Sequence, residues 1–568
     1  MKLKVFTNED DALLFWSIEK PIPECRGFAI ERKRGKEPAQ FLPNRVGFDT
    51  EDDLGDSEIG TGPHTRPSTE WPFQRFSWTD HDVQTGDTVS YRVIPIVRDA
   101  SGDLQQLLDE GSDWSERITL EARGIFRPFF NRGFVMSQFM ARFLARNKLS
   151  LAQFKDRIRD RDDKTIREFL SGDLRIALVT QMEIARKERG HIYAALFELT
   201  DDELLDGLLR LGKRAHVVLA NGSIKKGKDE TSAEARLRDG NKDARKKLKK
   251  AGVEVEPKHR YLSPGALGHN KFLVRTDKEG NPLIAWTGST NWAPTGLCTQ
   301  INNGLLIDDK KIARVYLDQW HRLADAKSAF PPELLDANTE PKDVRTGKMR
   351  ATVWFTRTRK GADLEALRAE VNAAKQGILF LMFMPGAAGL FSTVAARSAE
   401  PKLYVRGVVS EIPNGRDDES AVDVNLIDGS NHNALHLDII QPEGVKHPLA
   451  QFAIEVTRRE FLSGVGHAII HSKVLVIDPF SATPVVITGS HNYSTSASSK
   501  NDENFIIIRG DRPLAEAYAV NIMGAYAHYR WRALLSQVRK PFNGLRDHDR
   551  WQAPMIKSNQ RDLSFFGV

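Results

Sequence analysis

Cysteine is almost absent from this sequence of 568 residues, which has only Cys25 and Cys298. Two distant cysteines match neither the clustered spacing of a structural zinc site nor a disulfide framework. The first ten residues also lack the apolar stretch of a secretory signal. We therefore expect a protein of the reducing cytoplasm.

A strong charge of one sign is also lacking. Lys and Arg number 82 and Asp and Glu 76, so the formal net charge of +6 is a weak argument for an anionic partner. One uncharged run, 377–396, is long enough to cross a bilayer, but Pro385 and Gly386 interrupt it. The run predicts a buried strand, a turn and the start of a helix, and we expect no transmembrane segment.

The remaining composition is that of a globular protein, with 40% hydrophobic residues. Residues 1–125 contain short runs rich in aromatic and β-branched residues, such as 12–16 and 88–97, separated by turns. This pattern predicts an all-β, immunoglobulin-like sandwich. The run GDTVSYRVIPI resembles a fibronectin type III domain, which either positions and binds something else or serves as a structural appendage.

The rest of the chain contains a repeat. A charged helical stretch at 126–187 is expected to be a connector. Residues 192–220 then predict a strand, a helix and a second strand, and the same order recurs at 378–409. Repetition of one unit indicates an internal duplication, with halves at 188–335 and 345–568.

Each half ends in a similar block of residues. The first reads HNKFLVRTD from His269 and later WTGSTNW, and the second reads HSKVLVID from His471 and later ITGSHNY. Residues two apart on a strand point to one face, so each His lies beside a Lys, Lys271 or Lys473. If the halves pack together, two imidazoles and two ammonium groups converge on one cleft, which suits a phosphodiester.

These blocks resemble the signature of the phospholipase D superfamily, His-x-Lys-x4-Asp followed by Gly-Ser-x-Asn. The second block carries it in full, whereas Thr276 stands in place of the Asp in the first. Over about 130–530, the resemblance implies an α/β fold of two duplicated α/β/α sandwich halves packed as a pseudo-dimer, so that the active site needs no oligomer. The expected catalytic residues are His269, Lys271, His471, Lys473, Asn291, Asn492 and Glu503, and the expected supporting residues are Ser289, Ser490, Asp478 and Asn302.

The expected catalytic residues suggest a mechanism. One imidazole would attack phosphorus and form a phosphohistidine, while the other protonates the leaving alkoxide. The lysines and asparagines would hold the phosphoryl oxygens, so we expect no metal and no cofactor, consistent with the family's metal independence. For Asp478 we favour a structural role, holding a turn or a backbone amide, over direct chemistry.

In the superfamily, the residue that orients each His often comes from the opposite half. Glu503 would then orient His269 and make it the nucleophile. Asn302, or Gln300 nearby, would face His471 and leave it as the acid.

The substrate stays open at this point. Two motifs in one chain resemble the lipid-acting members, so we favour hydrolysis or transfer at phospholipid head groups, with peripheral membrane contact. A nuclease acting on DNA or RNA and a catalytically decayed anion-binding module are the alternatives. The basic run 236–250 fits a nucleic acid, an anionic lipid surface or a solvated amphipathic helix. The polar inserts 411–420 and 428–445 are candidates for setting specificity.

Overall fold

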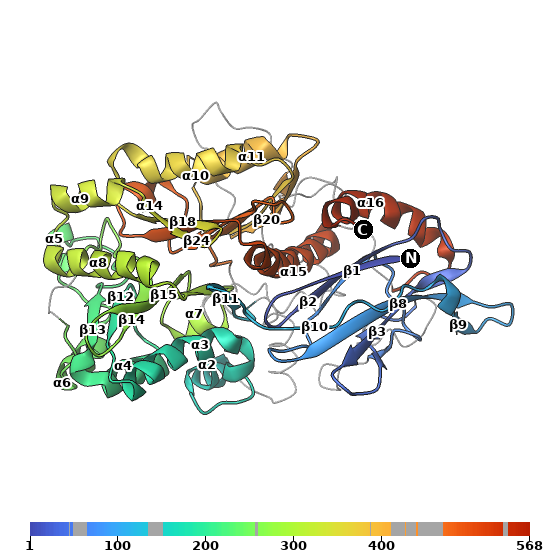
Figure 1. Cartoon of the computed structure of the whole chain (residues 1–568), viewed down its shortest axis with the longest axis horizontal. Coiled ribbons are helices and arrows are strands. Elements are labelled where there is room, and N and C mark those ends of the chain that lie inside the picture. The colour runs from blue at the N-terminus through green and yellow to red at the C-terminus, as the bar shows by residue number, and fades with distance from the viewer. Residues whose placement is uncertain are drawn as a thin grey trace.

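The computed structural model describes residues 1–44, 46–48, 65–133, 151–255, 260–386, 388–410, 426–427, 439–440, 470–537 and 544–568. Insert 411–420 and nearly all of 428–445 lie outside these residues, as does 134–150 of the expected connector. Figure 1 shows a β-rich part that contains the N-terminus at one end of the molecule and two mixed α/β parts at the other.

The N-terminal part consists of two main antiparallel sheets. One pairs its strands in the order β1 (Lys2–Thr7), β2 (Ala12–Ser17), β7 (Ser77–Asp80). The other has the order β10 (Ile118–Thr119), β8 (Thr88–Arg98), β3 (Cys25–Arg34), β4 (Gln40–Phe41), with β9 (Leu104–Gln106) also on β8. A small hairpin joins β5 (Pro43–Asn44) and β6 (Arg66–Pro67). Trp16 and Phe28 are among the buried residues of these sheets, with their rings in edge contact.

The first α/β part is built on a six-stranded sheet. Its order is β11 (Phe126–Phe130), β16 (Asn303–Ile307), β15 (Pro282–Gly288), β14 (Lys271–Thr276), β12 (Ile192–Leu196), β13 (Ala215–Leu219). Helices cover both faces, because alternate strand residues point to opposite sides: Ala194 packs in the core that holds α3 (Arg167–Lys187) and α4 (Asp202–Leu211), and Ala195 in the one that holds α8 (Lys310–Ala326). Segment 126–187 thus supplies an edge strand and a covering helix of this part.

The second α/β part has a nine-stranded sheet. Its order is β17 (Lys342–Thr346), β18 (Met349–Phe355), β25 (Asn504–Arg509), β24 (Val485–Gly489), β23 (Val474–Ile477), β19 (Gly377–Met382), β20 (Tyr404–Val409), β22 (Ile439–Ile440), β21 (Leu426–Ile427). From β18 to β20 this order repeats β11 to β13 strand for strand. The chain is therefore a mixed α/β protein whose second sheet contains a copy of the first.

Several helices lie at positions that the sequence predicts. The uncharged run 377–396 forms buried β19, a turn and most of α11 (Leu390–Ser398), as expected. The basic run includes α6 (Lys242–Lys250), which buries Ala244 and Leu248. The other α-helices of the described residues are α2 (Leu151–Arg159), α5 (Ser232–Arg236), α7 (Pro294–Cys298), α9 (Pro332–Thr339), α10 (Ala362–Asn372), α14 (Thr495–Ser499), α15 (Arg512–Gln537) and α16 (Gln552–Phe566).

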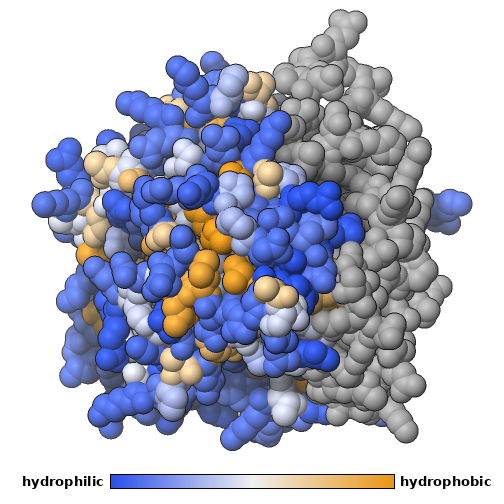
Figure 2. All heavy atoms as spheres, turned by 90° about the vertical axis from the view of Figure 1, so that its right-hand side faces the viewer, coloured by the Kyte–Doolittle hydropathy of each residue, from blue (hydrophilic) through white to orange (hydrophobic). Residues whose placement is uncertain are grey.

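The C-terminal residues join the second half to the N-terminal sheets. On α16, the ring of Phe566 stacks on Phe15 with centroids 4.1 Å apart, and Phe565 stacks on Tyr404 at 4.0 Å. Helix α16 lies beside the N-terminus in Figure 1, and Figure 2 faces the side of the molecule on which it lies. That view shows a strip of apolar residues in a largely hydrophilic surface.

Within the described residues, no helix combines the length and the apolar character that crossing a membrane requires.

Candidate active site

His269 is held by the opposite half of the molecule. Its backbone N–H donates to Asp502 O at 2.9 Å, and its Nδ1 lies 2.8 Å from Glu503 Oε2. Both residues are buried, with exposed fractions of 4% for His269 and 0% for Glu503. A neutral imidazole that donates Nδ1–H to this carboxylate keeps the lone pair on Nε2.

His471 has the reciprocal arrangement. Its backbone N–H donates to Ile301 O at 3.0 Å, and its Nδ1 lies 2.8 Å from Asn302 Oδ1. The first half thus holds the histidine of the second, as the second holds that of the first. The difference is chemical, because one imidazole faces a carboxylate and the other faces a neutral amide.

Each lysine lies beneath its own histidine. The ammonium group of Lys271 donates to His269 O at 2.7 Å, and that of Lys473 donates to His471 O. Both lysines are almost fully buried, and neither forms an ion pair among the described residues. Their remaining N–H groups are available to phosphoryl oxygens.

Two phenylalanine rings that the sequence analysis missed line the site. Phe197 follows β12 and Phe383 follows β19, at matching positions of the repeat. Phe197 contacts His269 with ring centroids 4.9 Å apart, and Phe383 contacts His471 at 4.7 Å. The signal that could have found them is their position one residue beyond the first strand of each repeated unit.

The two signature serines bind the groups that hold the histidines. Ser490 Oγ donates to Glu503 Oε2 and Ser289 Oγ donates to Asn302 Oδ1, each at 2.7 Å. Asn501 Nδ2 adds a third hydrogen bond to Glu503, on Oε1, at 3.1 Å. These hydrogen bonds therefore fix the two oxygens that face the imidazoles, Glu503 Oε2 and Asn302 Oδ1.

The two signature asparagines have buried amide oxygens. Asn291 Oδ1 and Asn492 Oδ1 find no hydrogen-bond partner among the described residues. Asn291 Nδ2 donates instead to Glu198 Oε2 at 3.1 Å. Glu198 was not predicted from the sequence, since it belongs to no signature.

Asp478 follows the last residue of β23, whereas His471 precedes the first, so the two lie at different ends of this strand. Its carboxylate accepts the backbone N–H groups of Lys375, Gln376 and Gly377, at 2.9, 2.6 and 2.9 Å. These contacts join the end of β23 to the beginning of β19. The structure therefore places Asp478 away from the other site residues.

Burial sets the protonation states of the first half. It lowers the pKa of His269 to about 4, although Glu503 opposes the shift, and it lowers the pKa of Lys271 to about 7. For Glu503, burial alone would raise the pKa, but the hydrogen bond and charge of His269 and the charge of Lys271 lower it. At neutral pH the pair is a carboxylate beside a neutral imidazole.

The second half is shifted in the same direction. Burial, followed by the charges of Lys473 and Lys271, lowers the pKa of His471 well below its usual value. The charge of His269 contributes to the same shift. An anionic ligand near these groups would offset their like charges.

Polar contacts fix one half against the other around the site. Asn504 Nδ2 donates to Asn270 Oδ1 at 2.8 Å, and Thr287 Oγ1 donates to Asn504 Oδ1 at 2.5 Å. The corresponding residue of the first half, Asn303, donates from Nδ2 to Thr488 Oγ1 of the second half at 2.8 Å. Buried networks in which the donors find acceptors favour a single arrangement of the side chains.

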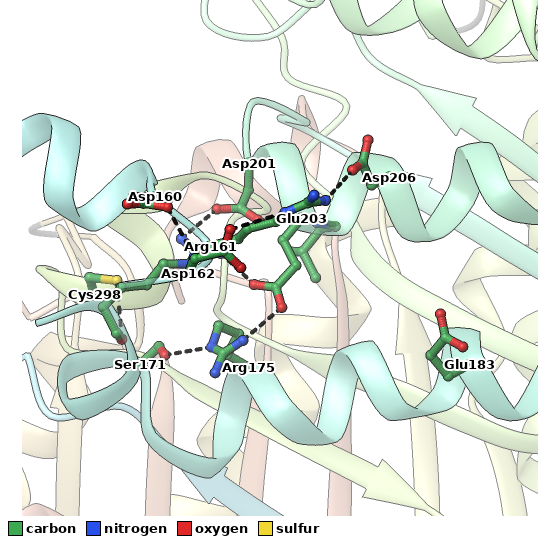
Figure 3. A network of polar contacts seen from close by, with 12 residues as sticks. Asp160, Arg161, Asp162, Ser171, Arg175, Glu183, Asp201, Glu203, Asp206 and Cys298 are labelled. Carbon is green, nitrogen blue, oxygen red and sulfur yellow. Dashed lines mark hydrogen bonds and ion pairs between the residues drawn. The ribbon is translucent and has the colours of Figure 1, made fainter. Parts of the chain in front are cut away.

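A second polar network supports the turn that carries Glu198. Arg175 reaches both Ser171 and Glu203 (Figure 3), and the Glu203 carboxylate lies 2.7 Å away. Asp201 caps α4 by accepting from Leu204 N, and its own N–H donates to Trp292 O. The backbone hydrogen bond of Asp201 thus joins the turn to Trp292, the residue that follows Asn291.

Comparisons with known proteins agree with the geometry. Residues 178–324 and 416–523 match a family described as cardiolipin synthase, PLD-like domain. Each matched segment contains one of the two His-Lys blocks. A phospholipase D from Rickettsia prowazekii (strain Madrid E) is 49% identical over 53 residues, which are 9% of this chain and 23% of the relative.

Solved structures with some similarity include a phosphatidylserine synthase from Haemophilus influenzae, 12% identical over 70% of this chain and 93% of that one, with a TM-score of 0.40. Another is Nuc from Salmonella typhimurium, a phospholipase D family member that is 14% identical over 27% of this chain and 86% of its own, with a TM-score of 0.18.

Proposed function

We propose that this chain, a phospholipase D-like enzyme of the phospholipase D superfamily, hydrolyses or transfers phosphodiesters through a phosphohistidine on His269. The observation that carries the proposal is the exchange of partners between the halves, with His269 on Glu503 and His471 on Asn302, each at 2.8 Å. This arrangement leaves both Nε2 atoms free of the orienting contacts.

The proposed reaction has two steps. His269 Nε2 forms a bond to phosphorus while the bond to the leaving oxygen breaks, and His471, protonated on Nε2 once the phosphodiester is bound, gives that oxygen its proton. The negative charge of the bound diester favours this protonated form of His471. His471 then takes a proton from water or an alcohol, whose oxygen displaces the histidine from phosphorus. Glu503 stabilises the positive charge on the phosphorylated imidazole, and this favours His269 over His471 as the nucleophile.

The proposal assigns charge stabilisation to the protein itself. Lys271 and Lys473 lie beside the two histidines, and with Asn291 and Asn492 they would bind the phosphoryl oxygens as their charge grows. We therefore expect the reaction to proceed in EDTA.

Phospholipid head groups are the favoured substrates. The description of the matched family, cardiolipin synthase, PLD-like domain, supports this choice. The basic residues of α6 do not decide between lipid and nucleic acid, since burial of Ala244 and Leu248 is what any amphipathic surface helix shows. A nuclease is the second candidate.

The N-terminal sheets are proposed to be a fibronectin type III-like module. The pairing orders β1-β2-β7 and β10-β8-β3-β4 support this assignment.

The packing of the two halves as a pseudo-dimer has support in the reciprocal hydrogen bonds of His269 and His471. A cytoplasmic location and peripheral contact with a membrane stay predictions.

A substrate panel tests the proposal. Bis(p-nitrophenyl) phosphate in EDTA reports the chemistry, and we expect turnover that is lost in His471→Ala. Phospholipid vesicles and oligonucleotides then separate the substrate classes. Cleavage of DNA without release of any lipid head group would reverse the preference, and equal activity of His471→Ala on every diester would favour a decayed binding module.

A further inference from the structure

The matching positions after Phe197 and Phe383 hold different residues. The first half has Glu198 there and the second half has Met384, which is 49% exposed. Each of these two residues follows a ring that contacts one of the histidines. The first half thus has a carboxylate at a position where the second half has an apolar side chain.

Glu198 is in direct contact with the residues proposed to bind phosphate. Its Oε2 accepts from Asn291 Nδ2 at 3.1 Å, and its charge interacts with that of Lys271. Glu198 makes no other hydrogen bond and no ion pair among the described residues, and it is partly exposed. A carboxylate offers about four acceptor positions, so most of its capacity remains for a ligand.

The backbone on both sides of Glu198 is fixed. Phe197 N donates to Asn270 O at 3.0 Å, next to His269. Leu199 N donates to Asn241 Oδ1 at 3.0 Å, and Thr200 N donates to Trp292 O at 2.9 Å. The carboxylate is therefore positioned before a ligand arrives, as a specificity group requires.

The charges of the site define what this carboxylate prefers. Lys271 interacts with Glu198 and Glu503, and Lys473 interacts with Glu503. Burial lowers the pKa of both lysines, and a bound phosphate favours their charged forms, so that two cations then balance two carboxylates. A bound phosphodiester adds one negative charge. A ligand that carries its own positive charge near the phosphorus restores the balance, whereas a second anionic group increases the imbalance.

We propose that Glu198 makes the site selective for phosphodiesters in which one alcohol carries an ammonium group within a few bonds of the phosphate, and disfavours diesters with a second anionic group. This inference rests on the proposed function, since it assumes that the phosphoryl group lies between the lysines. Burial raises the pKa of Glu198, and Lys271 and Asn291 oppose this shift; an ammonium ligand would oppose it in the same way.

The test compares two diesters of nearly equal size. Methyl 2-aminoethyl phosphate and methyl propyl phosphate differ only in an ammonium group in place of a methyl group, and methyl 2-carboxyethyl phosphate adds a negative charge. Ligand-observed NMR with the full chain gives the affinity for each, and new resonances would report any turnover. We expect the amino diester to bind at least about tenfold more tightly than the propyl diester, because a hydrogen bond between two charged groups contributes more to affinity than a neutral one.

In Glu198→Gln, which keeps the size of the side chain, we expect this ratio to fall to about threefold or less and the carboxylate diester to bind more tightly than before. Met384→Gln, the matched variant of the other half, should leave the ratio unchanged. A tenfold preference that survives in Glu198→Gln, or no preference in the wild type, overturns the inference. Because affinity is measured without turnover, failure of the proposed reaction appears separately, in the bis(p-nitrophenyl) phosphate assay.

Discussion

His269 and Glu503 are 234 positions apart in the chain, and Nδ1 of one lies 2.8 Å from Oε2 of the other. Two backbone contacts fix the same place, since Asp502 O accepts from His269 N and Asp502 N donates to Leu267 O. The imidazole and its partner are thus placed by the packing of one half on the other.

The Glu503 charge should matter more than its hydrogen bond. In Glu503→Gln an acceptor remains but the negative charge is lost, so the positive phosphohistidine loses its counter-charge and the amide can select the wrong tautomer. We expect kcat on bis(p-nitrophenyl) phosphate to fall about 10²–10⁴-fold, with little change in Tm. Adding the matched change Asn302→Asp to Glu503→Gln supplies a carboxylate to His471 instead, and we expect that it does not restore the rate. A loss of less than threefold in Glu503→Gln would contradict the assignment.

Removal of the proposed acid should reveal the intermediate. Without His471, the covalent adduct forms slowly with a good leaving group such as p-nitrophenolate, but no base activates water to release it. We expect His471→Ala to accumulate a phosphoryl adduct on His269, detected by mass spectrometry of the digested protein. An adduct on His471 in the His269→Ala variant, with none in His471→Ala, would exchange the two roles.

Stability should depend on pH through the histidines. The pKa of His269 is lowered from 6.5 to about 4, so between these pH values the unfolded chain binds a proton that the folded chain does not. Stability is therefore lost as the pH falls through this range, by on the order of 2–3 kcal/mol for His269. His269→Gln should lose correspondingly less between pH 7 and pH 4, as measured by urea unfolding. Equal losses in the two proteins would show that this histidine is not held neutral.

A buried ion pair behind the site should be essential for folding. Arg260 Nε and an Nη of the same residue bind the two oxygens of Asp502 at 2.7 and 2.8 Å, and both side chains are nearly inaccessible. Arg260→Ala leaves a buried carboxylate unpaired and should cost about 3–5 kcal/mol. The exposed pair of Arg350 with Asp343 provides the control, for which we expect about 0–1 kcal/mol in Arg350→Ala. Similar costs for the two variants in chemical denaturation would refute the difference.

The sequence indicated the α/β repeat because its patterns are local. The strand, helix and strand of 192–220 appear as β12, α4 and β13, and the apolar run beginning at Gly377 forms β19. The place of β11 could not be predicted in this way, since an edge strand is defined by its pairing with β16, which lies far along the chain. For the same reason, the packing of α16 on the N-terminal sheets had no signal in either segment.

The candidate site was predictable only where spacing repeats. His269 and His471 stand out because two copies of one block are improbable by chance. The two phenylalanines follow apolar strands and are marked only by their matching positions in the repeat, and Glu198 has no carboxylate counterpart in the second half, where Met384 stands. The proximity of Phe197 and Glu198 to His269 depends on the register of β12 against β14, in which Leu196 pairs with Lys271. That of Phe383 to His471 depends on the register of β19 against β23.

The stacking of Phe566 on Phe15 has a consequence for synthesis of the protein. Trp551 Nε1 also donates to Cys25 O, and Gln552 exchanges hydrogen bonds with the backbone of Ile22. The N-terminal sheets are made before residues 551–566, and they therefore present an uncovered apolar surface until those residues leave the ribosome. Because transiently exposed apolar surface promotes aggregation, these sheets depend on a segment that is translated more than 400 residues later.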